Sequence, residues 1–361
     1  MSVTPCGFTR TPEKGLARLH WTDVGWAVEG RPPEVPELRP LRGLEIDWPE
    51  RPVPLDGLLG LAAAGVPLTA VRAAPWVPGP LAHLLTDRTW LDHAPDGTTR
   101  CLADLRREEH SVRLRRLAHA TPAPLASPPV TIVMSTKRPA LVAAALGQME
   151  RQRGVAAEVA LGLHGVSFDQ VRAAVEGCAL PVTWVEAEAS VPFGEVLNRA
   201  AALAGGDLLA KWDDDDWYGP DHLADLFMAL TYAGADVVGT TAEFFYLEPL
   251  KATIRRTTFA SGAGYPSEVW SDHVAGGTIM VPVSKFREVG GFPAVSRAVD
   301  LEFLKAAHAA GARVYRTHGL GYVLRRGLGD EHTWRLPLAH FLKVAANQWR
   351  GFRPSLLMEA A

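Results

Sequence analysis

The pattern of apolar and polar residues changes at about residue 130. Beyond it, short apolar runs rich in β-branched residues are each followed by a segment with apolar residues at helical spacing. The runs read VTIVMST, EVALGLHG, VTWVEA and DLLAKWD, and the helical segments begin near residues 140, 168, 193 and 219. Because strands that alternate with helices favour parallel pairing, the pattern predicts a three-layer α/β/α domain with a mostly parallel, Rossmann-like sheet.

The first 128 residues have a different texture, with frequent prolines, scattered tryptophans and short candidate elements. We expect strands in LARLHW and GWAVEG, short helices in DGLLGLAAAG and PLAHLLTD, and a longer helix in LADLRREEHSVRLRRLAH. That helix mixes arginines with glutamates, which favours a solvated face over a phosphate site.

A proline-rich stretch, TPAPLASPP at 121–129, opposes both helix and sheet and is expected to be a linker. The sequence therefore predicts three parts: a mixed α+β accessory domain of unknown role over 1–125, the α/β domain over 129–334, and a helical tail over 335–361. The accessory domain is expected to recognise an acceptor or to form a dimer.

The predicted tail is amphipathic, with apolar residues on one helical face: Leu338, Phe341, Leu342, Ala345 and Trp349. Basic residues lie nearby, as in helices that bind a membrane surface. We expect the helix to pack on its own domain or on a second subunit. Peripheral membrane contact and a homodimer both stay open.

Composition narrows the classes of function. The formal charge of −3 provides no global basic field, so no nucleic-acid partner is expected. The three cysteines lie far apart and match neither a zinc site nor a disulfide framework, and no apolar run approaches the ~20 residues of a membrane span. These features favour a cytoplasmic protein. Peripheral contact with the inner face of the membrane is compatible with them.

Four consecutive aspartates, Asp213–Asp216, stand at the end of a predicted buried strand, where like charges repel strongly. An EF-hand loop is excluded, because Tyr218 occupies its glycine position and Ala224 its glutamate position. A Mg²⁺ or Mn²⁺ ion completed by nucleotide phosphates fits better. In a parallel sheet the ends of the strands at Thr136–Arg138 and His164 meet the aspartates at one edge, where ligands bind.

Residues 130–334 resemble the family 2 glycosyltransferases of GT-A fold, which use nucleotide-sugar donors. The resemblance is carried, in order, by VTIVMSTKRPALVAAALGQMERQ, by GEVLNRAAALAGGDLLAKWDDDDWYGPDHL, and by GGTIMVPVSKFREVGGF followed by VDLEFLKAAHAAGARV. The first contains the family's Thr-x-Arg-Pro turn, at Thr136 and Arg138. The second ends in the metal-binding Asp-x-Asp motif of the family, and the last bears its catalytic carboxylate.

The resemblance implies an inverting, metal-dependent transfer of a sugar to an acceptor hydroxyl of a glycan, a lipid-linked molecule or a small molecule. Asp213 and Asp215 match the Asp-x-Asp positions, with Asp216 as a substitute ligand, and His332 resembles a histidine that completes the metal site in some members. Asp300 matches the catalytic base, with Glu302 as the alternative. From their position at a strand end, Arg325 and Arg326 are candidates to bind the diphosphate.

One departure concerns the nucleotide base. Where the family usually has an aspartate at the end of the second strand, this sequence has Leu163-His164-Gly165-Val166, which leaves the nucleotide open and makes His164 a candidate base contact. Two other functions stay open. A sugar nucleotidyltransferase would release pyrophosphate, and a non-catalytic glycosyltransferase-like scaffold would use the fold for assembly.

Overall fold

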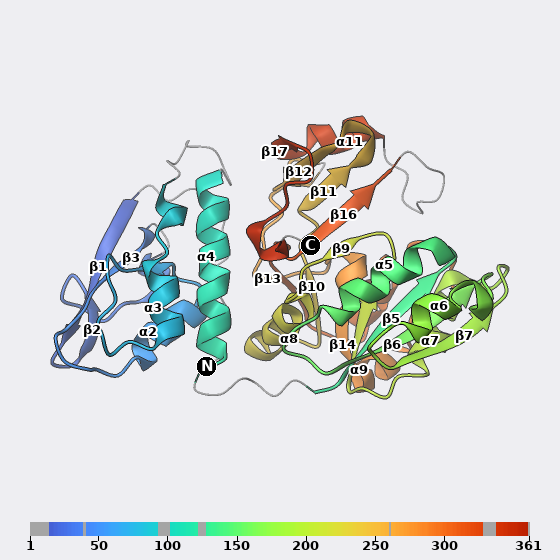
Figure 1. Cartoon of the computed structure of the whole chain (residues 1–361), viewed down its shortest axis with the longest axis horizontal. Helices are drawn as coiled ribbons and strands as arrows, with labels where there is room; N and C mark the ends of the chain where they lie inside the picture. The colour runs from blue at the N-terminus through green and yellow to red at the C-terminus, as the bar shows by residue number, and fades with distance from the viewer. Residues whose placement is uncertain are drawn as a thin grey trace. The chain divides into compact units, whose positions relative to one another are not determined.

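Two units make up the chain, Met1–Leu125 and Ala126–Ala361 (Figure 1). The structure, a computed structural model, describes residues 14–38, 41–92, 102–121, 128–259, 261–327 and 337–359. Each unit has its own sheet and its own apolar core. They are therefore considered separately.

The N-terminal unit is built on a four-stranded sheet in the order β2-β1-β3-β4. Strand β2 pairs antiparallel with β1, whereas β1, β3 and β4 run parallel. The expectation of a mixed α+β fold here is confirmed. Its elements are β1 (Lys14–Thr22), β2 (Gly25–Val28), α1 (Val35–Leu38), β3 (Leu41–Asp47), α2 (Asp56–Ala63), β4 (Leu68–Thr69), α3 (Gly79–Thr86), η1 (Thr89–Leu91) and α4 (Leu102–His119).

Helix α4 corrects the prediction of a solvated charged face. Its His110 Nε2 lies 2.7 Å from the carbonyl oxygen of Leu68, and Ser111 Oγ donates to that of Gly65 at 2.8 Å. Both side chains are buried, and Leu114 of the same helix joins the core of the unit. The prediction failed because backbone carbonyls beside β4 accept these polar groups, so α4 packs with them inside the fold.

The C-terminal unit contains an eight-stranded sheet in the order β13-β15-β10-β14-β8-β5-β6-β7. Antiparallel pairing at β14 and β13 sets these two strands against the other six, which share one direction. The predicted mostly parallel sheet is confirmed. The strands are β5 (Val130–Thr136), β6 (Ala157–His164), β7 (Val182–Ala187), β8 (Leu208–Trp212), β10 (Val237–Thr240), β13 (Val269–Trp270), β14 (Met280–Pro282) and β15 (Val314–Thr317).

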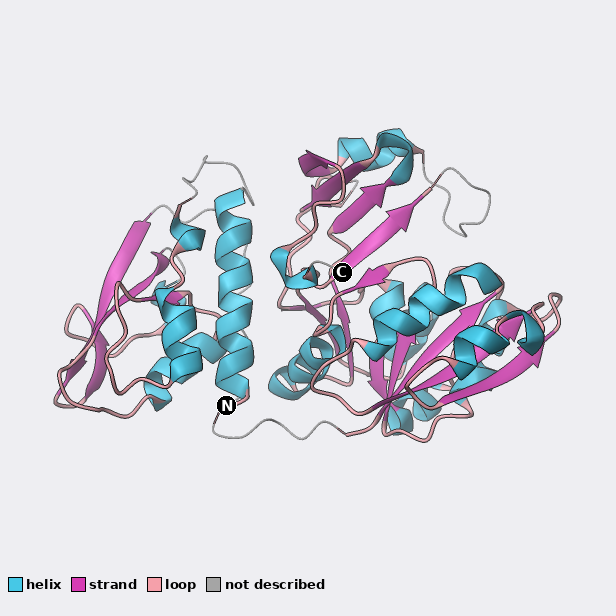
Figure 2. Cartoon of the chain, in the orientation of Figure 1, coloured by secondary structure: helices cyan, strands magenta, loops and turns pink. Residues whose placement is uncertain are grey.

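Helices cover both faces of this sheet, as Figure 2 shows, which gives the three layers. Alternation along β5 sends Ile132 and Met134 into one core and Val133 into the other. The first core takes side chains from α5 (Pro139–Glu150), α6 (Arg172–Glu176) and α8 (His222–Ala233). The second takes them from α7 (Phe193–Ala201), α9 (Val283–Val289) and α10 (Val299–Ala309). Burial on both faces explains why a strand such as β5, in which every residue is buried, reads as a continuous apolar run.

A second, five-stranded sheet, β17-β12-β11-β16-β9, completes the unit. Its strands are β9 (Trp217–Tyr218), β11 (Phe244–Leu247), β12 (Ala252–Arg256), β16 (Tyr322–Arg326) and β17 (Ala345–Arg350). The 3₁₀ turns η2 (Phe168–Gln170), η3 (Glu248–Leu250), η4 (Gly276–Thr278) and η5 (Leu356–Met358) and the short α11 (Leu338–Lys343) join the elements.

The predicted helical tail is wrong beyond Lys343. Residues Ala345–Arg350 form strand β17, which pairs antiparallel with β12 and places Trp349 opposite Thr253. Pairing with β12 satisfies backbone groups that a strand edge leaves open, and this outweighs the helical spacing of the apolar residues. The continuous amphipathic helix over Leu338 to Trp349, which was expected to pack on its own domain or on a second subunit, is therefore not formed.

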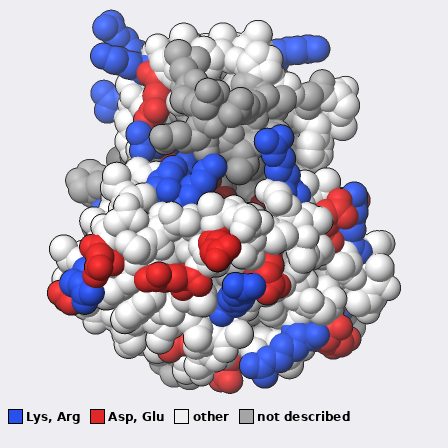
Figure 3. All heavy atoms as spheres, turned by 90° about the vertical axis from the view of Figure 1, so that its right-hand side faces the viewer, with Lys and Arg blue, Asp and Glu red and all other residues white. Residues whose placement is uncertain are grey.

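Surface features agree with the charge balance of the sequence. On the face of the molecule seen in Figure 3, acidic and basic side chains lie interspersed over much of the surface. Within the described ranges, every helix is too short or too polar to cross a bilayer.

The second core generates a stability prediction. Leu197 on α7 is fully buried in it, whereas Leu203, just beyond the helix, is 40% exposed. Leu197→Ala should cost about 2–5 kcal/mol, because it removes buried methyl groups and leaves a cavity. Leu203→Ala is the matched control. Scanning calorimetry of the full chain should show a lower unfolding midpoint for the first variant alone, and equal midpoints would contradict this packing.

Candidate active site

The carboxyl ends of β5, β6 and β8 meet at one edge of the large sheet, as predicted, and a pocket of about 190 Å³ opens there. Arg325 is not among the lining residues, and His332 lies outside the described residues. The lining is Ser135, Thr136, Lys137, Arg138, His164, Phe193, Lys211, Asp213, Asp214, Asp215, Asp216, Ser296, Asp300 and Arg326.

A buried lysine joins the two carboxylates assigned to metal binding and proton transfer. Lys211 Nζ lies 2.6 Å from Asp213 Oδ1 and 3.1 Å from Asp300 Oδ1. The lysine side chain is only 2% exposed, whereas those of Asp213 and Asp300 are about one third exposed. Burial lowers the pKa of Lys211, but the two carboxylates raise it and the net shift is upward. Lys211 is therefore a fixed positive charge beneath the pocket.

Backbone shape brings these carboxylates together. A Cβ on Gly276 would lie 2.2 Å from Asp300 Oδ2, and one on Gly277 would lie 2.7 Å from Asp213 Oδ2. The turn η4 can pass between them only because both residues are glycines. Asp300 stands in the first turn of α10, after Ala298 in the left-handed conformation at φ 57°. Such a conformation costs a non-glycine residue energy and is held here by the surrounding structure.

Arg138 neutralises the middle of the acidic run. Its Nη1 lies 2.9 Å from Asp215 Oδ2, and its Nε donates to Asp214 Oδ2 at 3.2 Å. Thr136 also donates to Asp214. The Thr-x-Arg segment that follows β5 therefore holds the aspartates that follow β8.

Asp216 is directed away from its neighbours into a buried polar network. It accepts from Tyr322 Oη at 2.5 Å and from the backbone N–H of Arg325 at 3.0 Å, and Arg326 Nη1 lies 3.5 Å away. Burial, opposed by Arg326 and assisted by Asp215 and Asp213, raises the pKa of Asp216 to about 7. The contacts of the Asp216 carboxylate are therefore primarily structural, because they hold the segment after β8 to β16.

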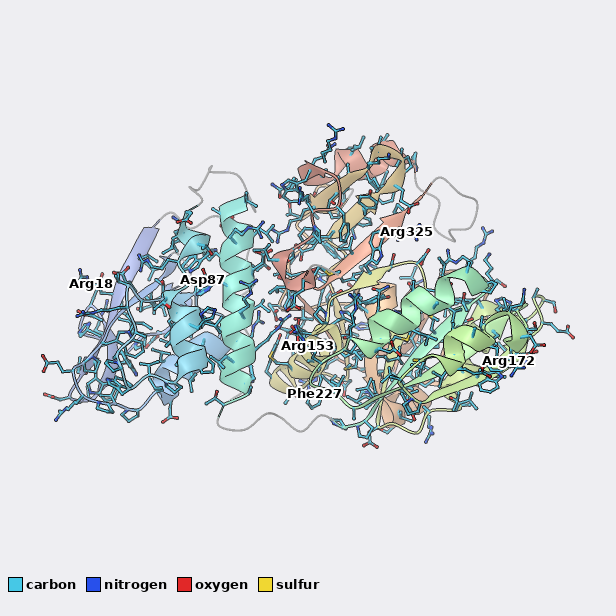
Figure 4. The ribbon with its side chains drawn as sticks, viewed as in Figure 1. Arg18, Asp87, Arg153, Arg172, Phe227 and Arg325 are labelled. Carbon is cyan, nitrogen blue, oxygen red and sulfur yellow. The ribbon has the colours of Figure 1, made fainter. Side chains whose placement is uncertain are left out.

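Two predicted nucleotide contacts already have partners within the protein. His164 Nε2 lies 3.2 Å from the carbonyl oxygen of Ala189. Arg325, labelled in Figure 4, is ion-paired with Glu248 and lies over the ring of Trp217, 5.7 Å from its centroid. Arg326 is better placed for a phosphate than Arg325, since it lines the pocket.

The side chains of the pocket suit a cation that takes only part of its ligands from the protein. Among the residues that the structure describes, no three His, Cys, Asp or Glu side chains are grouped as the ligands of a metal ion. Asp213 and Asp215 fit an ion that takes one or two carboxylates from the protein and its other ligands from phosphates and water.

The sequence analysis missed the residues that balance the charges from within. Lys211 carried a signal, because it is the one ionisable residue in the apolar run that becomes β8. Tyr218 carried none. Its hydroxyl accepts from the Asp213 N–H and donates to the Gly277 carbonyl, both at 2.9 Å.

Comparisons with known proteins add a likeness of fold. No protein-family model matches the chain, and a search of curated proteins found no match. Among solved structures, a mannosyltransferase of Pyrobaculum calidifontis in complex with GDP-Man and Mn²⁺ is 19% identical over 77% of this chain and 69% of its own, with a TM-score of 0.45. S. aureus TarS is 15% identical over 55% of this chain and 36% of its own, with a TM-score of 0.41.

A shorter form of TarS, residues 1–349 with UDP, gives the same identity and TM-score over 60% of its length. The chain is thus similar in structure to glycosyltransferases. At these identities and TM-scores the likeness carries no argument about the function of the chain.

The buried Asp216 predicts a pH dependence. Its pKa is about 7 in the folded protein against an ordinary value of 3.8 for an aspartate, so the folded state holds the proton more tightly and loses stability as pH rises from about 4 to 7. Asp216→Asn removes this titration. In chelator, the melting temperature of the variant relative to wild type should rise over that range and level off above it.

Asp169→Asn provides the matched control, because the Asp169 side chain is 79% exposed. It should follow the wild-type profile. A difference between Asp216→Asn and wild type that stays constant with pH would show that Asp216 is not buried as described.

Proposed function

We propose that the protein is a metal-dependent, inverting glycosyltransferase that moves a sugar from a nucleoside-diphosphate sugar to an acceptor hydroxyl. One observation carries the proposal: Asp213, after β8, and Asp300, on α10, lie in one pocket and contact the same buried lysine. The reaction needs a carboxylate for the cation on the leaving diphosphate and another to accept the proton of the hydroxyl.

The donor side is formed by residues at the ends of β5, β8 and β16. Asp213 and Asp215 are the ligands that the chain offers to Mg²⁺ or Mn²⁺, and a bound cation would supply Lewis-acid stabilisation of the leaving diphosphate. Arg326 places a guanidinium on the pocket lining, where phosphate oxygens can accept hydrogen bonds. Arg138 orients Asp215, since it holds one of its two oxygens.

The acceptor side is Asp300. Burial raises its pKa, opposed by Lys211 and assisted by Asp213, and the net direction is upward. A raised pKa favours a general base, because such a carboxylate holds the abstracted proton more firmly. Lys211 holds Asp300 Oδ1, which leaves Oδ2 as the oxygen to receive the hydroxyl proton.

A sugar nucleotidyltransferase is the alternative reaction in such a pocket, and its product separates the two. Glycosyl transfer releases a nucleoside diphosphate, whereas nucleotidyl transfer releases pyrophosphate. The observation that favours glycosyl transfer is Asp300, because attack by a sugar phosphate oxygen needs no base to remove a proton. A scaffold that had lost catalysis would have no need of the glycine pair that admits both carboxylates.

Asp300→Asn should abolish transfer and preserve donor binding. A general base contributes ~10²–10⁴-fold to the rate, about 3–5 kcal/mol of barrier. Turnover is measured as release of nucleoside diphosphate, and donor binding by titration. Glu302→Gln is the matched control two residues away, where the carboxylate pairs with Lys305 at 2.8 Å. If Glu302→Gln lost turnover and Asp300→Asn kept it, the base would be Glu302.

The donor is identified by a thermal-shift panel of UDP, GDP, CDP, ADP and dTDP, each with and without Mn²⁺. A nucleotide that binds only the folded protein raises its melting temperature. One nucleotide should do so in a Mn²⁺-dependent manner, and Asp215→Asn should reduce the Mn²⁺-dependent part. No shift with any nucleotide would favour the scaffold, and an equal shift without Mn²⁺ would remove the metal from the proposal.

A further inference from the structure

The N-terminal unit has a pocket of its own, of about 590 Å³, at the carboxyl ends of parallel strands. It extends over the end of β3 and the segment that follows β4, which is the edge of a parallel sheet where ligands bind. Its volume is within the range of small-molecule sites. The lining is Arg18, Glu45, Ile46, Asp47, Trp48, Pro49, Glu50, Val71, Arg72, Ala73, Ala74 and Pro75.

Strand register aligns the charged groups of this pocket. Arg18 on β1 stands opposite Glu45 on β3, and Asp47 follows two residues later on the same face. Arg18, labelled in Figure 4, lies with its Nη1 3.8 Å from Asp47 Oδ2, and the two side chains are 80% and 67% exposed. Glu45 is paired with Arg88 at 2.8 Å. The pocket therefore presents carboxylates and guanidiniums together, as acceptors beside donors.

Trp48 is the one aromatic residue in the pocket lining that the structure describes, and it is partly buried against the core of the unit. Its ring meets Trp26 edge to face at 5.8 Å and Trp76 at 5.4 Å, so two other tryptophans fix its orientation. The Trp48 Nε1–H is buried and has no acceptor among the described residues. Val71, 70% exposed, adds an apolar surface to the lining.

We infer that this pocket is a saccharide-binding site. A sugar has hydroxyls that both donate and accept, which suits paired charges of opposite sign, and C–H faces that pack on an aromatic ring. Three carboxylates and two guanidiniums line the pocket and nearly cancel, so no strong field selects a highly charged ligand. The site takes a saccharide of low net charge. That this saccharide is the acceptor rests on the proposed function.

The test is a printed array of defined oligosaccharides probed with the full-length chain in the absence of any nucleotide. A subset of neutral saccharides should bind. Affinity for the strongest is then titrated with wild type and with Arg18→Ala/Asp47→Ala. Loss of two hydrogen-bonding charged groups should weaken binding at least roughly tenfold. These exposed side chains can be removed without unfolding the unit, which the melting temperature checks.

The chain offers a matched control, the exposed pair Arg172 and Asp169 in the other unit. Arg172→Ala/Asp169→Ala should bind the saccharide like wild type. Trp48→Phe, which keeps an aromatic ring, should weaken binding less than the double variant. Equal binding by wild type and Arg18→Ala/Asp47→Ala, no saccharide bound by wild type, or binding of peptides in place of saccharides would each overturn the inference.

Saccharide binding is separable from catalysis. Asp300→Asn should bind the array saccharide as wild type does, because its substitution lies in the other unit. If a saccharide binds and the double variant loses it while no sugar is ever transferred, the saccharide site stands and the proposed function fails. If transfer to a small acceptor occurs and no saccharide binds without nucleotide, the proposed function stands and the saccharide site fails.

Discussion

The neutralisation of four consecutive carboxylates is the constraint on which the C-terminal unit depends. Such a run at the end of a buried strand is tolerable only if each charge finds a partner. Lys211 forms an ion pair with Asp213, and Arg138 forms ion pairs with Asp214 and Asp215. Asp216 accepts a hydrogen bond from Tyr322 and is ion-paired with Arg326. These partners come from β8 itself, from the segment after β5 and from β16. The charge balance therefore also joins the two sheets of the unit.

This internal balance changes how a cation would bind. From the sequence, a metal ion bound together with nucleotide phosphates was expected to balance the charge of the four aspartates. In the structure, Lys211, Arg138 and Arg326 balance much of that charge. Asp213 and Asp215 each keep one oxygen engaged by a basic side chain. An ion at these carboxylates would share them with Lys211 and Arg138, and its remaining ligands would come from phosphates and water. An ion in such a site would bind more tightly when a nucleotide supplies its remaining ligands.

The layers of the fold were predictable because local pattern and global burial agree. Fully apolar strands such as Val130–Thr136 need cover on both faces, and the helices that follow them supply it. The strand ends gave Thr136, Arg138, Asp213 and Asp215 their common edge, and the family resemblance added Asp300. Lys211 was overlooked because a lysine beside aspartates resembles an ordinary surface charge.

Other errors have a common physical cause. The spacing of apolar residues from Leu338 to Trp349 predicts a helix for the isolated segment. Hydrogen bonding to the edge of β12 stabilises a strand instead. Pairing between distant segments cannot be predicted from local spacing. In α4 the same limitation applies, since the acceptors of His110 and Ser111 are carbonyls more than forty residues away. The pocket beside Trp48 was also beyond reach, because its lining is assembled from three separate segments.

Strand β14 determines which connection of the chain lies against Asp213 and Asp300. Because β14 runs against β8 and β10, the segment before it, and not the one after it, lies at the carboxyl edge of the sheet. The turn η4, which lies against Asp213 and Asp300, is thus the end of the connection from β13 to β14. Exchanges in that connection would act on Asp213 and Asp300, which lie against its two glycines, while the loops after β5 and β8 stay unchanged. One segment of the fold can thus vary while the segments that carry Thr136, Arg138 and Asp215 stay the same.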